Sequence, residues 1–117
     1  MPSIPKAELW IRGGHEDGRT IDLTDGVTSI GRAPINKVVV EVTGVSRQHA
    51  RIRAEVNGYW IEDLGSRNGT FVNGTPVEGE GQKLRNMDRI DLGGCEVLHW
   101  VFREVAATVG ITRPSMG

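Results

Sequence analysis

Residues 44–52, which read GVSRQHARI, gather the side chains of this sequence that are most able to do chemistry. Ser46 and His49 would form the nucleophile and base of a hydrolase if the imidazole reached the hydroxyl. The same serine beside Arg47 would instead form one wall of an anion site, because hydroxyl and guanidinium groups donate hydrogen bonds. The first function makes the protein a catalyst and the second makes it a binding protein.

Two further stretches carry a similar set of donors. Residues 29–32 read SIGR and residues 64–70 read LGSRNGT, so they add arginines, hydroxyls, a side-chain amide and glycine-exposed N–H groups. None of the three stretches contains a carboxylate, and the nearest one in the sequence is Asp63. A set made of donors suits a phosphate group, which is negatively charged and offers three acceptor oxygens.

The catalytic interpretation has weaker support from the sequence. A nucleophilic serine needs a base within hydrogen-bond reach and a third group that orients the base. His49 lies three residues after Ser46, so the loop would have to curl sharply, and Asp63 becomes the third member only by assumption. The G-x-S-x-G pattern of a nucleophile elbow is missing. We therefore expect no catalytic residue.

The sequence also predicts neither a metal site nor a cofactor. His15, His49 and His99 are far apart, and Cys95 is the only cysteine, so no ligand spacing of a zinc site is present. The glycine-rich loop that cradles a nucleotide is missing as well.

Short β-strands are the elements that must position these groups. Sixteen glycines and five prolines divide the chain, and turns such as Asn57-Gly58 supply the positive φ angles of tight hairpins. This pattern predicts an all-β sandwich of mostly antiparallel strands, with binding loops at one end. The expected strands are residues 7–12, 19–23, 27–30, 37–42, 50–56, 59–64, 70–72, 88–92 and 96–103.

Alternation within these strands predicts the core and the domain bounds. Leu98, Trp100 and Phe102 share one face of the last strand, and we expect all three tryptophans in the core. Residues 7–104 form the expected domain, whereas residues 1–6 and 105–117 have the composition of tails or linkers.

Charge and composition exclude several classes of partner. Fourteen basic against fifteen acidic residues give a net charge of −1, which argues against nucleic-acid binding. The sequence has no apolar run long enough to span a membrane and no signal peptide. A single cysteine fits a reducing compartment, so we expect a cytoplasmic protein.

Three motifs in order resemble the forkhead-associated (FHA) domain. They are GR at Gly31-Arg32, SRQH at Ser46–His49 and GSRNGTFVNG at residues 65–74. The spacings of 14 residues from Arg32 to Ser46 and 22 from Ser46 to Asn68 also fit that family. The resemblance covers about residues 8 to 104.

This resemblance implies a sandwich of about eleven strands in two sheets and a non-catalytic signalling module that recognises phosphothreonine. By position, Arg32 would contact the phosphothreonine, Ser46 would donate its hydroxyl to the phosphate, and Arg47 would supply backbone N–H and guanidinium. Asn68 would hydrogen-bond the main chain of the peptide. The segment Ser66-Arg67 would complete the phosphate wall.

Other motif residues would support the site structurally. His49 matches a histidine that braces the serine loop from behind, and Gly31, Gly69 and Thr70 would shape the loops. One departure is Gly44, at a position where some members carry a basic residue that reads an acidic residue three places after the phosphothreonine.

The implied partner is a threonine-phosphorylated protein, a substrate of a Ser/Thr kinase. Thr108 and Thr112 make the tail of this chain a further candidate ligand. A phosphate-independent interaction domain on the same fold is the alternative function.

Overall fold

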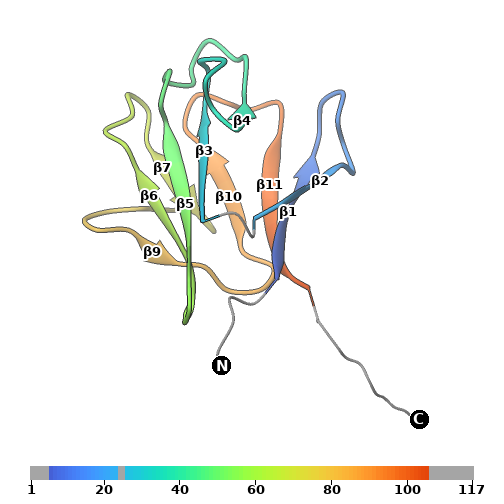
Figure 1. Cartoon of the computed structure of the whole chain (residues 1–117). Coiled ribbons are helices and arrows are strands. Elements are labelled where there is room, and N and C mark those ends of the chain that lie inside the picture. The colour runs from blue at the N-terminus through green and yellow to red at the C-terminus, as the bar shows by residue number, and fades with distance from the viewer. Residues whose placement is uncertain (1–5, 24–25, 106–117) are drawn as a thin grey trace.

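The chain folds into two facing β-sheets in a computed structural model that describes residues 6–23 and 26–105 (Figure 1). Eleven strands and no helix are present in these two ranges. The prediction of an all-β sandwich is therefore confirmed. The strands are β1 (Ala7–Arg12), β2 (Thr20–Asp22), β3 (Val27–Gly31), β4 (Val38–Val39), β5 (Ala50–Glu55), β6 (Gly58–Asp63), β7 (Thr70–Val72), β8 (Thr75–Pro76), β9 (Gln82–Lys83), β10 (Arg89–Leu92) and β11 (His99–Glu104).

One sheet has six strands in the order β2-β1-β11-β10-β7-β8, and the other has five in the order β4-β3-β5-β6-β9. Neighbouring strands are antiparallel, as in the pairing of Leu9 with Phe102 and of Ile52 with Ile61. The exception is the short parallel pair of β3 and β4, in which Ile30 faces Val38. These two strands flank the first predicted binding loop: the chain enters the loop from β3 and leaves it into β4.

The core lies between the sheets and follows the period of two. Burial alternates strictly along β1, where Ala7, Leu9 and Ile11 point inward. On β11, Trp100 and Phe102 are buried, and Tyr59 of β6 packs against Phe102 with ring centroids 5.5 Å apart.

Two of the three tryptophans do not join this core, so the expectation that all three would was wrong. Trp10 and Trp60 are only partly buried because Leu9 and Ile11, and Tyr59 and Ile61, take the inward positions on either side of them. Trp10 instead lies on the outer face between two arginines, with the guanidinium carbons of Arg12 and Arg103 at 4.2 and 4.5 Å from its ring centroid.

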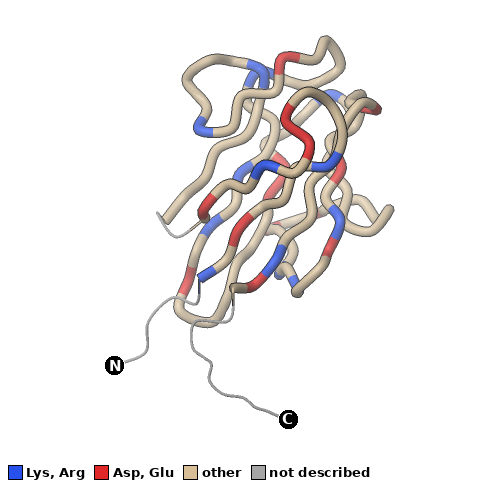
Figure 2. Tube along the Cα trace, turned by 90° about the vertical axis from the view of Figure 1, so that its right-hand side faces the viewer, with Lys and Arg blue, Asp and Glu red and all other residues tan. Residues whose placement is uncertain are grey.

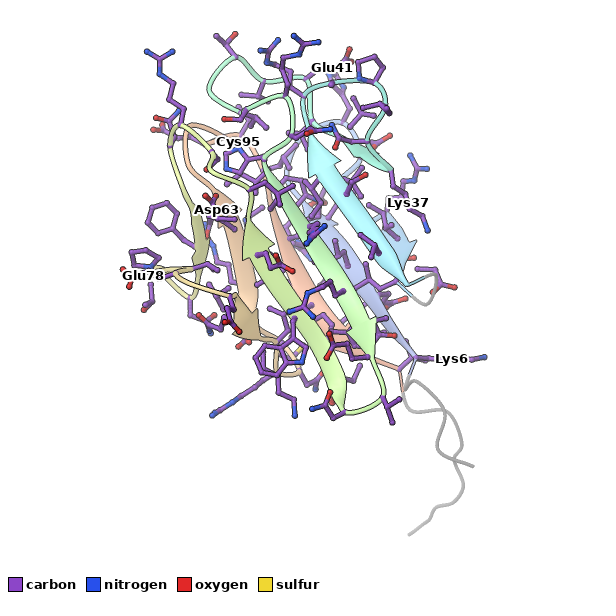
Figure 3. All side chains as sticks on the ribbon, turned by 60° about the vertical axis from the view of Figure 1, so that its left-hand side comes forward. Lys6, Lys37, Glu41, Asp63, Glu78 and Cys95 are labelled. Carbon is purple, nitrogen blue, oxygen red and sulfur yellow. The ribbon has the colours of Figure 1, made fainter. Side chains whose placement is uncertain are left out.

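The loops that contain the predicted site share one end of the sandwich, at the top of Figure 1. They are the β3–β4 loop (residues 32–37), the β4–β5 loop (residues 40–49), the β6–β7 loop (residues 64–69) and the β10–β11 loop (residues 93–98). The first and last described residues lie at the opposite end, where the Val105 N–H donates to the Lys6 carbonyl at 2.9 Å. Figure 3 shows Lys6 and Glu41 at these two ends.

Among residues 6–23 and 26–105 the structure has no helix of the length and apolar composition that a membrane crossing requires.

Candidate functional site

His49 joins two of the loops from inside the molecule. It is fully buried, its Nδ1 accepts a hydrogen bond from the Ser46 backbone N–H at 3.0 Å, and its Nε2 lies 2.7 Å from the Gly69 carbonyl. Because Nδ1 accepts, the proton is on Nε2, which donates to Gly69. The imidazole therefore contacts the backbone of Ser46 and positions the loop.

This geometry bears directly on the nucleophile interpretation. The Ser46 hydroxyl oxygen accepts a hydrogen bond from the Arg67 backbone N–H at 2.9 Å, and the ring nitrogens of His49 have other partners. Within the described part of the chain, no base is hydrogen-bonded to the Ser46 hydroxyl. The arrangement lacks the serine–base contact on which catalysis depends.

Arg32 lies directly beside Ser46. The Arg32 backbone N–H donates to the Ser46 carbonyl at 2.9 Å, and its Nε donates to the Val45 carbonyl at 3.0 Å. The Nε bond fixes the direction of the side chain and leaves the two terminal nitrogens of the guanidinium to bind a ligand. Arg32 is exposed and Ser46 is half-buried.

Asn36 and Gly31 hold the β3–β4 loop against the serine loop. The Asn36 side-chain amide is buried and donates to the carbonyls of Ala33 and Arg47 at 2.8 and 2.7 Å. A Cβ on Gly31 would lie 2.3 Å from the Arg47 carbonyl oxygen, so only glycine allows this approach. The sequence predicted a structural role for Gly31 but not for Asn36, whose place in the GRxxxN stretch of residues 31–36 was the only available signal.

Asp63 shapes the β6–β7 loop and lies just beneath it (Figure 3). Its carboxylate accepts hydrogen bonds from the Ser66 hydroxyl at 2.5 Å, the Ser66 N–H at 3.0 Å and the Thr70 hydroxyl at 2.7 Å. Burial alone would raise the pKa of Asp63, but these hydrogen bonds, together with the nearby His49, outweigh burial and lower it. The carboxylate therefore stays charged and holds the turn.

Two predicted contact residues, Ser66 and Asn68, already form hydrogen bonds with other groups of the protein. The Ser66 hydroxyl donates to Asp63 and accepts from the Gly69 N–H at 2.8 Å, and the Ser66 backbone N–H also donates to Asp63, so both donors of Ser66 are used inside the turn. The Asn68 Nδ2 donates to the Gly44 carbonyl at 2.7 Å. Its side-chain oxygen has no hydrogen bond within residues 6–23 and 26–105.

The β10–β11 loop supports the site from the other sheet, which the sequence analysis did not foresee. The Gly93 N–H donates to the Gly69 carbonyl at 2.7 Å, and a Cβ on Gly93 would overlap the Asn68 carbonyl oxygen at 1.8 Å. Gly44 and Gly94 pack backbone to backbone, because a Cβ on Gly44 would lie 2.6 Å from the Gly94 carbonyl oxygen.

The arginines of the site loops differ from those on the outer faces of the sheets in whether a carboxylate lies beside them. On the outer faces of the sheets, Arg53 contacts Glu62 and Glu55, Arg89 contacts Asp91 at 2.8 Å, and Arg103 contacts Glu8 at 2.6 Å. Figure 2 shows basic and acidic positions interspersed along the strands of the sandwich. By contrast, four described arginines have no carboxylate within 4 Å in the described ranges, and three of them lie in the site loops: Arg32, Arg47, Arg67 and Arg85.

Within residues 6–23 and 26–105 no cluster of histidine, cysteine or carboxylate side chains could hold a metal ion.

The family comparison agrees with this geometry. The family model described as FHA domain matches residues 28–93, which include all of the site loops up to Gly93. The chain belongs to the FHA domain family.

Similar proteins include regulators from bacteria. The glycogen accumulation regulator GarA of Mycobacterium tuberculosis is 37% identical over 87 residues, which are 74% of this chain and 52% of GarA. The oxoglutarate dehydrogenase inhibitor of Corynebacterium jeikeium is 34% identical over 87 residues, which are 74% of this chain and 59% of that protein. The FHA chain thus spans about half the length of the curated relatives that it matches.

Solved structures show the same fold. A structure from work on phosphothreonine-dependent FHA domain interactions is 34% identical, has a TM-score of 0.74, and covers 86% of this chain and 97% of its own. Mycobacterium tuberculosis EmbR in complex with a low-affinity phosphopeptide is 31% identical with a TM-score of 0.74, and the match covers 91% of this chain and 26% of EmbR.

In this FHA domain, the site residues predicted from the sequence lie in three loops that meet at one end. Direct hydrogen bonds connect Ser46 to Arg32 and Arg67, and Asn68 to Gly44. Arg47 is exposed beside Ser46, and its backbone N–H has no partner in the described ranges. Ser66 is the exception, because its hydroxyl faces Asp63.

Proposed function

We propose that this FHA domain is a non-catalytic module that binds phosphothreonine-containing peptides of partner proteins. The observation that carries the proposal is that three arginines without carboxylate partners in the described ranges adjoin Ser46. Arg32 and Arg67 are hydrogen-bonded to Ser46 through their backbone N–H groups, and Arg47 follows it in the chain. A doubly negative phosphate would satisfy this excess of donors. The likeness to a structure from work on phosphothreonine-dependent FHA domain interactions, and to EmbR in complex with a phosphopeptide, supports the same class of ligand.

Each residue has a role that follows from its free donors. The Ser46 hydroxyl, which accepts from Arg67 N–H, still has its own hydrogen to donate to a phosphate oxygen. In the proposed complex, the terminal nitrogens of Arg32 and the backbone N–H of Arg47 would donate to the phosphate, and the guanidinium groups of Arg47 and Arg67 would add positive charge at the edge of the site. The free side-chain oxygen of Asn68 would accept from an N–H of the peptide main chain.

Hydrogen bonds to a charged group contribute about 1.5–3 kcal/mol each, so four or five of them sum to about 6–15 kcal/mol. Ordering a flexible peptide costs on the order of several kcal/mol. The difference corresponds to a dissociation constant of about micromolar, or about −8 kcal/mol. Such an affinity suits a reversible signalling contact.

The test is isothermal titration with a degenerate phosphothreonine peptide pool and its dephosphorylated twin. We expect binding of the first only, and a loss of about tenfold or more in Arg32→Ala and in Ser46→Ala, because each removes a charge-assisted donor. Arg85→Ala is the matched control, since Arg85 follows β9 at the opposite end of the sandwich (Figure 1).

Circular dichroism of each variant shows whether the fold survives. Equal binding of the two peptide pools would support the alternative, a phosphate-independent interaction domain. Wild-type affinity in both Arg32→Ala and Ser46→Ala would refute the roles given to these residues.

The identity of the phosphorylated partner is part of the same proposal. We expect the ligand to be a substrate of a Ser/Thr kinase in the cytoplasm. The tail residues Thr108 and Thr112, which lie outside the described residues, are candidate ligands within the chain itself.

A further inference from the structure

Glu41 is an acidic side chain at an otherwise basic site. It is exposed in the β4–β5 loop, and with Arg32 and Thr43 it lines a hollow of about 400 Å³. Figure 3 shows it at the end of the sandwich that carries the binding loops. Within the described ranges Glu41 has no ion-pair partner, although Arg32 lines the same hollow.

A second, larger hollow of about 900 Å³ begins at the same residue. It runs between the β4 edge and the β1–β11 side of the sandwich, and Glu41 belongs to both linings. Its lining includes the exposed Val39 and Val97 and the partly buried Val42 and Leu98. A side chain with a long apolar stem and a cationic tip, such as lysine or arginine, matches this combination of valines and a terminal carboxylate.

The other charged or titratable groups that line the two hollows are Arg32, Lys37, His15 and the Arg19–Glu16 pair. Arg32 would be neutralised by the phosphate in the proposed complex, so its repulsion of a second cation would disappear. In the larger hollow, Arg19 already pairs with Glu16 at 2.7 Å, and Lys37 and His15 lie on the lining as well. Glu41 is thus a carboxylate that lines the same hollow as Arg32 and has no ion-pair partner of its own in the described ranges.

Gly44 leaves no space for a basic side chain that would favour an acidic residue in the peptide. Its backbone packs against Gly94, and a Cβ there would lie 2.6 Å from the Gly94 carbonyl oxygen, so this position has no room for a basic side chain that would read an acidic residue. The site therefore lacks the cation at position 44 and carries a carboxylate at position 41.

We infer that Glu41 selects peptides with a basic residue close to the phosphothreonine. This inference rests on the proposed function and adds a substrate class to it. An exposed ion pair stabilises a complex modestly, so the expected preference for a basic over a neutral residue is about two- to fivefold in affinity. The preference should shrink in 0.5 M salt, because the Debye length is then only about 4–5 Å.

The experiment uses an oriented library of phosphothreonine peptides in which one position at a time, from four before to four after, is fixed as Lys, Gln or Glu. We expect the wild-type protein to prefer Lys over Gln and Glu at one or two adjacent positions. In Glu41→Gln the preference should vanish, and in Glu41→Lys it should reverse toward Glu. Glu78→Lys is the control with the same change in charge, since Glu78 is exposed and lies away from the binding loops (Figure 3).

The two proposals fail in different ways in this library. If the wild type binds phosphorylated peptides with no basic preference, or if Glu41→Gln keeps that preference, the role of Glu41 is wrong while the proposed function stands. If no pool binds in a phosphate-dependent way, both are wrong. Reversal in Glu78→Lys as well as Glu41→Lys would show an effect of net charge and would also overturn the role of Glu41.

Discussion

Ser46 and Ser66 are both serines of the binding loops, but their hydroxyls have different uses. Ser46 accepts one hydrogen bond, from the Arg67 N–H, and keeps its own hydrogen for a ligand. The Ser66 hydroxyl both donates to Asp63 and accepts from Gly69, so it has no hydrogen left to donate to a ligand. The motif alone makes the two residues look alike.

This contrast predicts different consequences of removing each hydroxyl. Ser66→Ala should lower the free energy of unfolding by about 1–3 kcal/mol, because the half-buried Asp63 carboxylate loses a partner. Ser46→Ala should cost about 1 kcal/mol or less in stability but at least about tenfold in phosphopeptide affinity. Urea unfolding followed by tryptophan fluorescence and peptide titration measure the two quantities. A Ser46→Ala protein that is the less stable of the two, with unchanged affinity, would contradict these roles.

Much of the site could be predicted at this scale because residue type and spacing carry the information. Arg32, Ser46 and His49 belong to motifs with characteristic spacing, and the many hydrogen-bond donors of the loops indicate a phosphate ligand. Asn36, Asp63 and Glu41 could not be assigned in this way, since their roles depend on which backbone groups or hollows they face, and that is set by folding.

At the scale of strands and loops, alternation and turn residues identified the longer strands but not all of the topology. The two-residue strands β8 and β9 are too short to show a period, and the parallel pairing of β3 with β4 depends on a contact that no local pattern encodes. The expectation that Trp10 and Trp60 lie in the core was wrong, because membership of a strand does not say which alternate positions face inward, and their neighbours on the strand take those positions.

The contact of Gly44 with Gly94 is the least predictable of these features and makes a direct test of loop support. Gly44→Ala should lower the free energy of unfolding by about 1–3 kcal/mol, because the β4–β5 and β10–β11 loops would have to move apart. It should also weaken phosphopeptide binding, since the Gly44 carbonyl holds the Asn68 amide. Thermal unfolding and peptide titration measure both effects.

Gln48→Ala is the control for this prediction, because Gln48 is an exposed residue of the same loop. Gly44→Ala with wild-type stability would mean that the two loops can separate at no cost. The close approach would then have no part in shaping the site.

At the scale of the whole molecule, stability should depend on acid pH through Asp63. Burial tends to raise its pKa, but the hydrogen bonds from Ser66 and Thr70 bring it below the usual range in the folded protein. A carboxyl whose pKa is lower in the folded than in the unfolded chain stabilises the fold above the unfolded value of about 3.9. This contribution is lost as the pH falls through the lower, folded value.

Asp63→Asn should therefore be less stable than the wild type at pH 7 and should lose less stability between pH 5 and pH 2. Urea unfolding across this pH range measures both quantities. Glu62→Gln is a useful comparison, because the Glu62 pKa is also lowered, with burial opposing the hydrogen bonds from Arg51 and Arg53. Glu62 precedes Asp63 on β6, and its side chain points to the other face of the strand and away from the turn contacts of Asp63. A pH dependence in Asp63→Asn identical to that of the wild type would show that this carboxylate does not couple protonation to folding.

The placement of the site relative to the chain ends limits how the tail could bind. The strand β11 runs from the end with the binding loops to the end with Val105, and its six residues span about 20 Å. Thr108 follows Val105 by three residues, which extend at most about 11 Å. Three residues beyond Val105 therefore extend less far than the length of β11, so we expect a phosphate on Thr108 not to reach the site of its own domain.

A protein phosphorylated at Thr108 should therefore engage the site of a second copy. Because the tail leaves one end of the sandwich and the site lies at the other, the contact is head-to-tail and repeats from copy to copy. Sedimentation velocity of a semisynthetic protein with phosphothreonine at position 108 should show association that grows with concentration and disappears in Arg32→Ala. A monomer at every concentration, with its affinity for added phosphopeptide reduced, would mean that the tail reaches its own site, against the geometry. A monomer with undiminished affinity would mean that this site does not recognise the tail.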